Sequence, residues 1–136
     1  MQNNYTREEI MSLPEMKEQY DIEYPGYTPD ATALGYLKSL IRGQKITIVL
    51  GTWCGDSRLQ APRFYKILDA AGVDTTEVTL ICVNEMKQAE DGRTNDLNIT
   101  RIPVFIFSKD GRETGRITEA PEDTLENDMV ELLKNK

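Results

Sequence analysis

Histidine is absent from this chain of 136 residues, which removes the commonest general base and the commonest metal ligand of proteins. Cys-His nucleophilic catalysis and His-based zinc sites are therefore excluded. Cysteine occurs only as Cys54 and Cys82, so one chain lacks the thiolates for a zinc site made of four cysteines. Any chemistry has to use thiol, carboxylate or hydroxyl groups.

Basic residues are also scarce, with 16 Lys and Arg against 23 Asp and Glu and a formal net charge of -7. Nucleic acids and anionic membranes are bound through clustered Lys and Arg, so we expect neither as a partner. No segment approaches the roughly 18 apolar residues of a membrane span, and residues 1–9 lack the apolar core of a secretory signal. We expect a cytoplasmic protein, although a signal peptide removed before Met1 would leave the same sequence.

The length and the 39% hydrophobic content suffice for one hydrophobic core, but the chain is too short for two stable domains. We expect a single domain over residues 1–136, with an N-terminal helical extension at 1–44 and the main core at 45–136.

The N-terminal part has the pattern of two helices. Residues 6–20 carry apolar side chains at helical spacing, and Pro14 is expected to kink or split this helix. A turn is predicted at 24–27. A second helix is predicted from residue 28 to 41 or 42, with Pro29 at its first position. We expect both helices to pack on the sheet.

The rest of the chain alternates between strand and helix signals. Apolar runs predict buried strands, an amphipathic stretch predicts a helix, and a Lys-Asp-Gly turn between two runs predicts an antiparallel hairpin. This order is typical of a mixed sheet flanked by helices. The expected elements are strand 46–50, helix 57–71, strand 77–83, a short helix around 93–97, hairpin 104–118 and a closing helix from 121.

A cysteine lies where the first of these strands meets its helix. Such a position puts the sulfur near unpaired N-H groups and the positive end of the helix dipole, both of which favour the thiolate. A free cysteine is otherwise most often a small buried hydrophobe. The place of Cys54 between Trp53 and Gly55 favours an exposed, activated thiol. Arg58 adds positive charge nearby, and Asp56 adds negative charge.

Three motifs in order resemble those of the thioredoxin superfamily. The sequence W-C-G-D-S at 53–57 resembles the family's W-C-G-x-C, Pro62 matches its helix-kinking proline, and Ile102-Pro103 matches its cis-proline. The resemblance covers roughly residues 46–133. It implies an α/β thioredoxin fold, a central mixed sheet flanked by helices, to which the N-terminal helices are an extension.

The resemblance also assigns a substrate groove beside the thiol. In the family the cis bond lets the residue before the proline pair its backbone with an extended substrate. Trp53 is expected to flank this groove, with packing in the core as the alternative. The residues assigned to catalysis are Cys54 and Ser57, and those assigned to substrate binding are Trp53, Gly55, Asp56, Ile102 and Pro103.

Two positions depart from the family pattern. The family's resolving cysteine corresponds to Ser57, so no neighbouring thiol can displace a substrate from Cys54. The family's buried acid corresponds to Ile48. Ser57 is interpreted as a helix cap or as an O-H donor to the Cys54 thiolate, and the two roles are compatible. Cys82 is interpreted as a core side chain rather than a resolving thiol.

Three functions are weighed. The first and preferred one is thiol-disulfide exchange through Cys54 alone, as a slow reductase, an isomerase or a protein that removes thiol caps, with glutathione or another small thiol as co-substrate. The second is a redox-inactive binding or adaptor module, favoured by Ser57 and Ile48. The third is an iron-sulfur carrier like the monothiol glutaredoxins, whose C-G-F-S motif is similar to C-G-D-S. Expected partners are protein or small-molecule disulfides and thiols. The oligomeric state stays open.

Acidic residues gather around the start of the closing helix. They suggest either a metal site or charges that complement the helix dipole and keep the surface solvated, and we favour the second. We expect no resident metal or cofactor. These residues are Glu119, Glu122, Asp123, Glu126 and Asp128.

Overall fold

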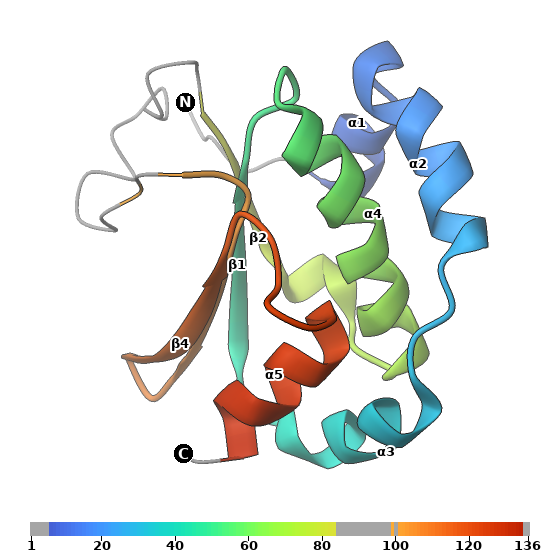
Figure 1. Cartoon of the computed structure of the whole chain (residues 1–136). Coiled ribbons are helices and arrows are strands. Elements are labelled where there is room, and N and C mark those ends of the chain that lie inside the picture. The colour runs from blue at the N-terminus through green and yellow to red at the C-terminus, as the bar shows by residue number, and fades with distance from the viewer. Residues whose placement is uncertain (1–5, 84–98, 100, 135–136) are drawn as a thin grey trace.

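A computed structural model describes residues 6–83, 99 and 101–134 of the chain. Its centre is a four-stranded mixed sheet in the order β2-β1-β3-β4, and the described helices lie on one face of it (Figure 1). β1 pairs with β2 in parallel and with β3 antiparallel, and β3 and β4 form the hairpin. The strands are β1 (Lys45–Leu50), β2 (Thr79–Cys82), β3 (Val104–Lys109) and β4 (Arg112–Thr118).

Alternation along the strands divides the apolar core between the two faces of the sheet. A larger cluster lies under the helices and contains Ile48 of β1 and Phe105 of β3, whose ring stacks on Phe64 with centroids 4.1 Å apart. A smaller cluster on the other face contains Val49, Ile81, Val83, Ile102, Val104 and Ile106. The central strands β1 and β3 are therefore buried on both faces for most of their length, as the apolar run of the first strand predicts.

The helix after β1 is α4 (Gly55–Ala70), which passes through Pro62 and ends before Gly72 at φ +81°. It begins two residues earlier than expected, because Cys54 already has the extended backbone of an N-cap, with φ -93° and ψ 125°. The thiol is thereby placed at the helix N-terminus.

The first predicted helix is split at Pro14, as expected. Thr6 caps the first piece in a capping box with Glu9, which places two hydrogen bonds across that turn. The turn predicted at 24–27 is wrong, since the second piece continues through Pro25. A proline this close to a helix end removes one hydrogen bond, and the N-H of Tyr27 still donates to Glu23. The two pieces are α1 (Arg7–Met11) and α2 (Pro14–Gly26).

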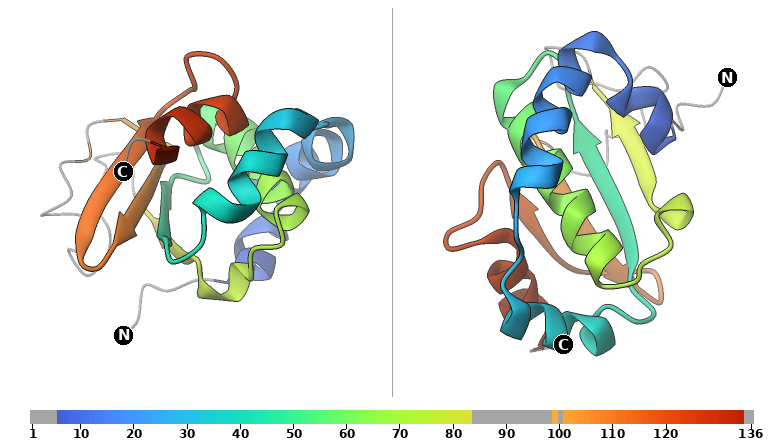
Figure 2. Two further views of the ribbon diagram at one scale, coloured as in Figure 1. Left: turned by 90° about the horizontal axis from the view of Figure 1, so that it is seen from below. Right: turned by 90° about the vertical axis from the view of Figure 1, so that its right-hand side faces the viewer.

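α2 lies outside α4, whereas α1 and α3 (Ala31–Leu40) contribute Ile10, Met11 and Leu37 to the larger apolar cluster, so the expected packing on the sheet is corrected for α2. α2 packs against α4, and α3 packs against α5 (Leu125–Lys134), as two further views show (Figure 2). Arg7 donates to both oxygens of Asp69, at 2.8 and 2.7 Å, and to the hydroxyl of Tyr20 at 2.6 Å. These contacts fasten α1 and α2 to α4.

Several predicted boundaries move because of caps and turns. α3 is capped by Asp30, whose carboxylate accepts from the N-H of Ala33 at 2.9 Å, so Pro29 precedes the cap instead of opening the helix. α5 starts at Leu125 rather than at Pro121. β2 is shorter than predicted because a 3-10 turn, Thr75–Glu77, precedes it.

The hairpin forms as predicted. Its turn is made by Asp110 and Gly111, with φ of +54° and +81°, a pair of left-handed residues that suits the twist of two-residue hairpins. The short helix expected around 93–97 lies outside the described residues. None of the helices in the described part of the chain is long and apolar enough to cross a membrane.

Candidate functional site

Cys54 lies in the turn that joins β1 to α4. Its side chain makes no capping hydrogen bond, and its S-H donates to the carbonyl oxygen of Ile102 at 3.9 Å. The backbone N-H of Cys54 donates to the carbonyl of Gly51 at 3.0 Å, which closes the turn. The thiol is partly exposed and packs against the smaller apolar cluster. Because the thiol lies at a helix N-terminus and is partly exposed, another molecule can approach it.

The carbonyl that faces the thiol belongs to a cis peptide bond between Ile102 and Pro103. Both residues are buried, and Ile102 is a member of the smaller cluster. The fold thus brings Ile102 and Pro103 next to Cys54 from a distant part of the sequence, as the resemblance implies.

Ser57 is the third residue of α4 and is completely buried. Its Oγ accepts a hydrogen bond from the N-H of Gly51 at 3.2 Å, across the turn that contains Cys54. The interpretation of Ser57 as a helix cap is wrong, because Cys54 occupies the cap position. Among the described residues, no hydrogen bond joins the Ser57 hydroxyl to the Cys54 sulfur. Ser57 instead ties α4 to the end of β1.

Gly51 is a residue of the site that the sequence did not single out. A Cβ at this position would lie 2.7 Å from two atoms of the Trp53 ring and 2.8 Å from Cδ1 of Ile102. These distances are shorter than real Cβ contacts, so only glycine lets Trp53 and Ile102 close over the turn. A glycine two residues before Trp53 is visible in the sequence, but its packing against Ile102 depends on the tertiary fold.

Trp53 lies at the rim of the site with 38% of its surface exposed. Its Nε1-H donates to the carbonyl of Val83 at 3.0 Å, which anchors the ring to the end of β2. Gly55 and Asp56 are exposed on the first turn of α4. The indole therefore combines the two roles that the sequence left open, an exposed flank and a packing contact.

Arg58 brings positive charge to this turn. Its Nη2-H donates to the carbonyl of Trp53 at 3.1 Å, and its Nε-H donates to the carbonyl of Cys54 at 3.4 Å. The guanidinium is held by backbone oxygens rather than by the exposed carboxylate of Asp56. The cation consequently stays beside the residue that carries the thiol.

Cys82 is close to this region along the sheet but lies on the other face. It pairs with Leu50 in the β1-β2 ladder and packs against the larger cluster, whereas Cys54 packs against the smaller one. Neither cysteine forms a disulfide in the described part of the chain. Burial raises the pKa of Cys82 to about 12. Its side chain is half-buried, and its packing against the larger cluster agrees with the interpretation of Cys82 as a core side chain. Ile48, at the position of the family's buried acid, lies fully buried in the larger cluster.

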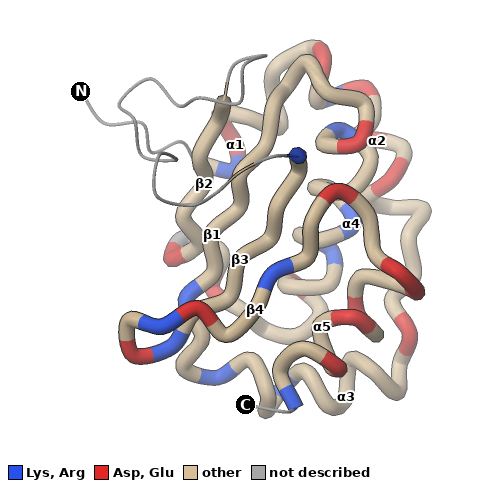
Figure 3. The backbone as a smooth tube through the Cα atoms, turned by 60° about the vertical axis from the view of Figure 1, so that its left-hand side comes forward, with Lys and Arg blue, Asp and Glu red and all other residues tan. Residues whose placement is uncertain are grey.

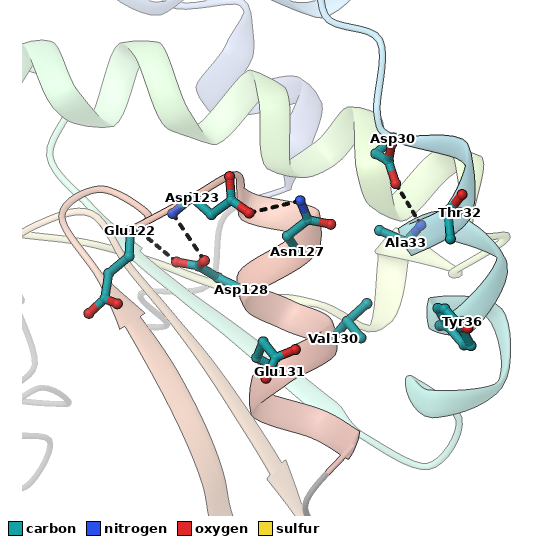
Figure 4. A pocket seen from close by; sticks show the side chains of 10 residues that line it. All are labelled: Asp30, Thr32, Ala33, Tyr36, Glu122, Asp123, Asn127, Asp128, Val130 and Glu131. Atoms are coloured by element: carbon teal, nitrogen blue, oxygen red, sulfur yellow. Dashed lines mark hydrogen bonds between the residues drawn. The ribbon is translucent and has the colours of Figure 1, made fainter.

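The acidic residues near α5 have structural partners, and several of them line a pocket of about 510 Å³ between α3 and α5 (Figure 4). Asp128 accepts from the N-H groups of Glu122 and Asp123, at 2.7 and 3.2 Å. Glu126 is buried and accepts from the Tyr27 hydroxyl at 2.5 Å and from the N-H of Asp30 at 2.7 Å. Their roles are to hold the turn before α5 and to join α5 to the start of α3.

Metal ligation has no support in this geometry. Within residues 6–83, 99 and 101–134, no group of three or more cysteine, aspartate or glutamate side chains is arranged to hold a metal ion.

A mixed sheet with a partly exposed thiol at the helix after β1, opposite a cis-proline, defines a thioredoxin-fold protein with one cysteine in its motif. The family model for thioredoxin matches residues 36–131, and the chain belongs to the thioredoxin family. This confirms the resemblance read from the three motifs. Members of this family are associated with thiol-disulfide redox chemistry.

Individual relatives agree with this assignment. The chain is 30% identical over 88 residues to an H-type thioredoxin of Oryza sativa subsp. indica, covering 63% of this chain and 67% of that protein. It is 27% identical over 85 residues to a thioredoxin of Malassezia sympodialis, covering 61% of this chain and 77% of that protein.

Solved structures share the fold. A protein of unknown function from Pseudomonas aeruginosa superposes with a TM-score of 0.61 at 14% identity, covering 91% of this chain and 76% of that one. The germline-specific thioredoxin Deadhead of Drosophila melanogaster gives a TM-score of 0.50 at 16% identity, covering 72% and 89%. At these identities the likeness concerns the fold alone.

Proposed function

We propose that this protein carries out thiol-disulfide exchange with a single motif thiol, that of Cys54. The observation that carries the proposal is the position of this sulfur, partly exposed at the N-terminus of α4 and facing the Ile102 carbonyl. Backbone N-H groups at a helix start favour the thiolate, which is the nucleophile in exchange. Cys82 is the poorer nucleophile, because burial raises its pKa to about 12.

The exchange has two balanced steps. The Cys54 thiolate attacks one sulfur of a substrate disulfide, a bond forms between Cys54 and that sulfur, and the other sulfur leaves as a thiolate. A small thiol such as glutathione then attacks the mixed disulfide, which releases Cys54 as a thiolate and leaves the former substrate sulfur bound to the small thiol. When the substrate is a glutathione-capped protein, the products are the free protein thiol and oxidised glutathione.

Ser57 is the reason for assigning the second step to an external thiol. It occupies the resolving position, is fully buried, and uses its hydroxyl to accept from Gly51. A hydroxyl there cannot attack the mixed disulfide in place of a thiolate. In this proposal Ser57 acts as a positioning residue that holds the turn bearing Cys54.

The substrate groove is proposed to run between the exposed turn of α4 and the cis-proline. Trp53, Gly55 and Asp56 form one side of it, and Ile102 and Pro103 form the other. Reduced glutathione is abundant in the cytoplasm, so we propose the cytoplasm as the site of action.

A binding module without redox turnover is the second candidate. Two observations favour it: the Ser57 hydroxyl is committed to a structural hydrogen bond, and Ile48 is a buried aliphatic side chain where the family has an acid. The iron-sulfur alternative is less favoured, because Trp53 before the cysteine and the run at 103–107 resemble thioredoxins, and the thioredoxin family model matches residues 36–131.

The test is turnover of a glutathione-capped peptide in the presence of reduced glutathione, measured as oxidised glutathione formed. We expect the wild-type protein and a Cys82→Ala variant to be active, and Cys54→Ala to be inactive. Mass spectrometry should find one glutathione bound at Cys54 when reduced glutathione is withheld. Peptide binding with neither adduct nor turnover would favour the binding module instead.

A further inference from the structure

The end of the sheet opposite Cys54 contains a second feature, a pocket of about 580 Å³ between the α3-β1 turn and the β3-β4 hairpin. Arg42 of the turn and Lys109 and Arg112 of the hairpin line it, together with the carboxylate of Asp110. Lys and Arg positions flank the hairpin tip in Figure 3. We call this feature the basic pocket, and its cationic lining contrasts with the net charge of -7 of the whole chain.

Among the residues that the structure describes, the cations of the basic pocket form no ion pairs. In the part of the chain that the structure describes, the ion pairs formed by Lys and Arg involve other cations, and Arg42, Lys109 and Arg112 have no carboxylate within pairing distance. Helices α3 and α5 end at this side of the molecule, and a helix C-terminus attracts cations. Their last turns, however, already contain Lys38 and Lys134, which do not line the pocket.

Among the described neutral polar side chains of the pocket, Gln44 keeps a free donor, whereas the hydroxyl of Ser39 already donates to the carbonyl of Tyr36. The hydroxyl of Thr114 donates to Oε1 of Gln44 at 3.0 Å. This contact fixes the orientation of the amide, so the Gln44 amide nitrogen, with its two N-H donors, is directed away from Thr114. Gln44 is half-buried and lines the same pocket. The lining therefore offers two guanidinium groups, one ammonium group and an amide donor.

The two walls of the basic pocket are in contact with each other. A Cβ at Gly43 would lie 3.5 Å from Cε of Lys109, so the lysine side chain crosses over the turn before β1. Gly43 has φ +77°, a conformation that glycine adopts without strain. Leu40 and Leu133 contribute apolar surface to the pocket. Its volume lies in the range of sites for small molecules, larger than a bare anion requires.

We propose that the basic pocket binds a small organic phosphate monoester, with the phosphoryl group held by Arg42, Lys109, Arg112 and the Gln44 amide. Guanidinium groups bind two phosphate oxygens at once. A site with three cations should favour a phosphate ligand, which carries two negative charges, over a carboxylate ligand, which carries one. The apolar surface of the pocket then contacts the organic part of the ligand. The site does not depend on the chemistry of Cys54.

Phenyl phosphate is the probe for this site, titrated into the 15N-labelled full chain at constant ionic strength and followed by NMR. We expect saturable shifts at the amides of Gly43 and Gly111 and at the side-chain amide of Gln44. Inorganic phosphate should bind several-fold more weakly than phenyl phosphate, because it leaves the apolar surface uncovered. Benzoate, a monoanion with the same ring, should also bind more weakly.

Variants separate a site from diffuse attraction of anions. Arg112→Gln and Lys109→Gln, both at exposed positions, should each weaken phenyl phosphate binding by about fivefold or more. Asp110→Asn should strengthen it. Lys38→Gln is the matched control, because it removes the same charge from α3 outside the pocket, and binding should stay within about twofold.

Three results would overturn the proposal. The first is linear, non-saturating shifts with phenyl phosphate. The second is an equal loss of binding in Lys38→Gln and Arg112→Gln, which would indicate general electrostatic attraction. The third is benzoate binding as tightly as phenyl phosphate. Cys54→Ala should bind the probe like wild type, so this test is independent of the redox proposal.

Discussion

The two cysteines lie at the same end of the sheet, Cys54 shortly after β1 and Cys82 at the last position of β2, yet they belong to different environments. Cys54 is in a turn at a helix N-terminus, next to the smaller apolar cluster, and is partly exposed. Cys82 is within β2 and packs against the larger cluster under the helices, where burial raises its pKa to about 12. The same functional group thus lies in a partly exposed turn at a helix start on one face and in a strand packed under the helices on the other.

The comparison extends to the residues around each cysteine. On the side of Cys54, close contacts among Gly51, Trp53 and Ile102 shape the turn that presents the thiol. On the side of the helices, ion pairs and tyrosine hydroxyls fasten α1 and α2 to α4. Changes on the first side should alter thiol reactivity, and changes on the second should alter stability without altering reactivity.

The largest expected effect is the difference in alkylation between the two thiols. At neutral pH, iodoacetamide should modify Cys54 in a Cys82→Ala variant at least about 100-fold faster than Cys82 in a Cys54→Ala variant. The physical reason is that a thiol with a pKa about three units above its ordinary value is almost never a thiolate at neutral pH. Peptide mapping by mass spectrometry gives both rates. Comparable rates in the folded protein would remove the distinction between the two faces.

A second thiol in the motif should let the protein complete the exchange without an external thiol. Ser57→Cys is expected to raise the rate of insulin reduction by dithiothreitol about tenfold or more over wild type, because a neighbouring thiol can displace the substrate from Cys54. Ser57→Ala is the control, since it removes the hydroxyl without adding sulfur. An unchanged rate in a folded Ser57→Cys protein would speak against a working geometry at this turn.

Filling the space over Gly51 should disturb the thiol side in particular. Gly51→Ala is expected to lower the free energy of unfolding by about 1–3 kcal/mol, because its Cβ overlaps the positions of Trp53 and Ile102. It should also change the alkylation rate of Cys54. Urea denaturation measures the first effect. Gly55→Ala is the matched control, because a Cβ there meets nothing within 4 Å and replaces a helical glycine.

A control that behaved like Gly51→Ala would show that any added methyl group is harmful in this turn. The specific contact with Trp53 and Ile102 would then no longer explain the need for glycine.

The smallest effect concerns the helical side and depends on pH. Burial acts to raise the pKa of Asp69, but hydrogen bonds from Arg7 and Tyr24 outweigh it, and the net result is a lowered pKa. A carboxylate with a lowered folded-state pKa stabilises the protein above its unfolded-state pKa of about 4, and the contribution is lost as the pH falls through the folded-state value. Asp69→Asn should therefore cost no more than about 1 kcal/mol near neutral pH, and less in acid, because the pair is partly exposed.

Urea denaturation at about pH 7 and about pH 3 measures this dependence. Asp21→Asn is the control, because Asp21 pairs with Lys17 on the exposed surface of α2 and should have a smaller effect. The alkylation rate of Cys54 should be unchanged in both variants. A changed rate in Asp69→Asn would show that the two sides of the molecule are coupled.

Much of this protein is determined by local sequence. The apolar run of β1, the helix that follows it and the Asp-Gly turn of the hairpin have patterns that depend on neighbours only a few residues apart. The same is true of the placement of Cys54 at a helix start. For these reasons the α/β architecture and the position of Cys54 at a helix start follow from the amino-acid sequence alone.

Other features depend on residues far apart in the sequence. α2 continues through Pro25 while its residues pack against α4, and Glu126 is buried because Tyr27 and Asp30 satisfy its oxygens across about a hundred residues of chain. Ser57 bonds Gly51 instead of capping its helix, since the cap position falls to Cys54. Local patterns specify which segments form strands and helices. Only tertiary packing decides which polar groups form hydrogen bonds with each other, and that Gly51 must be glycine so that Trp53 and Ile102 can pack over it.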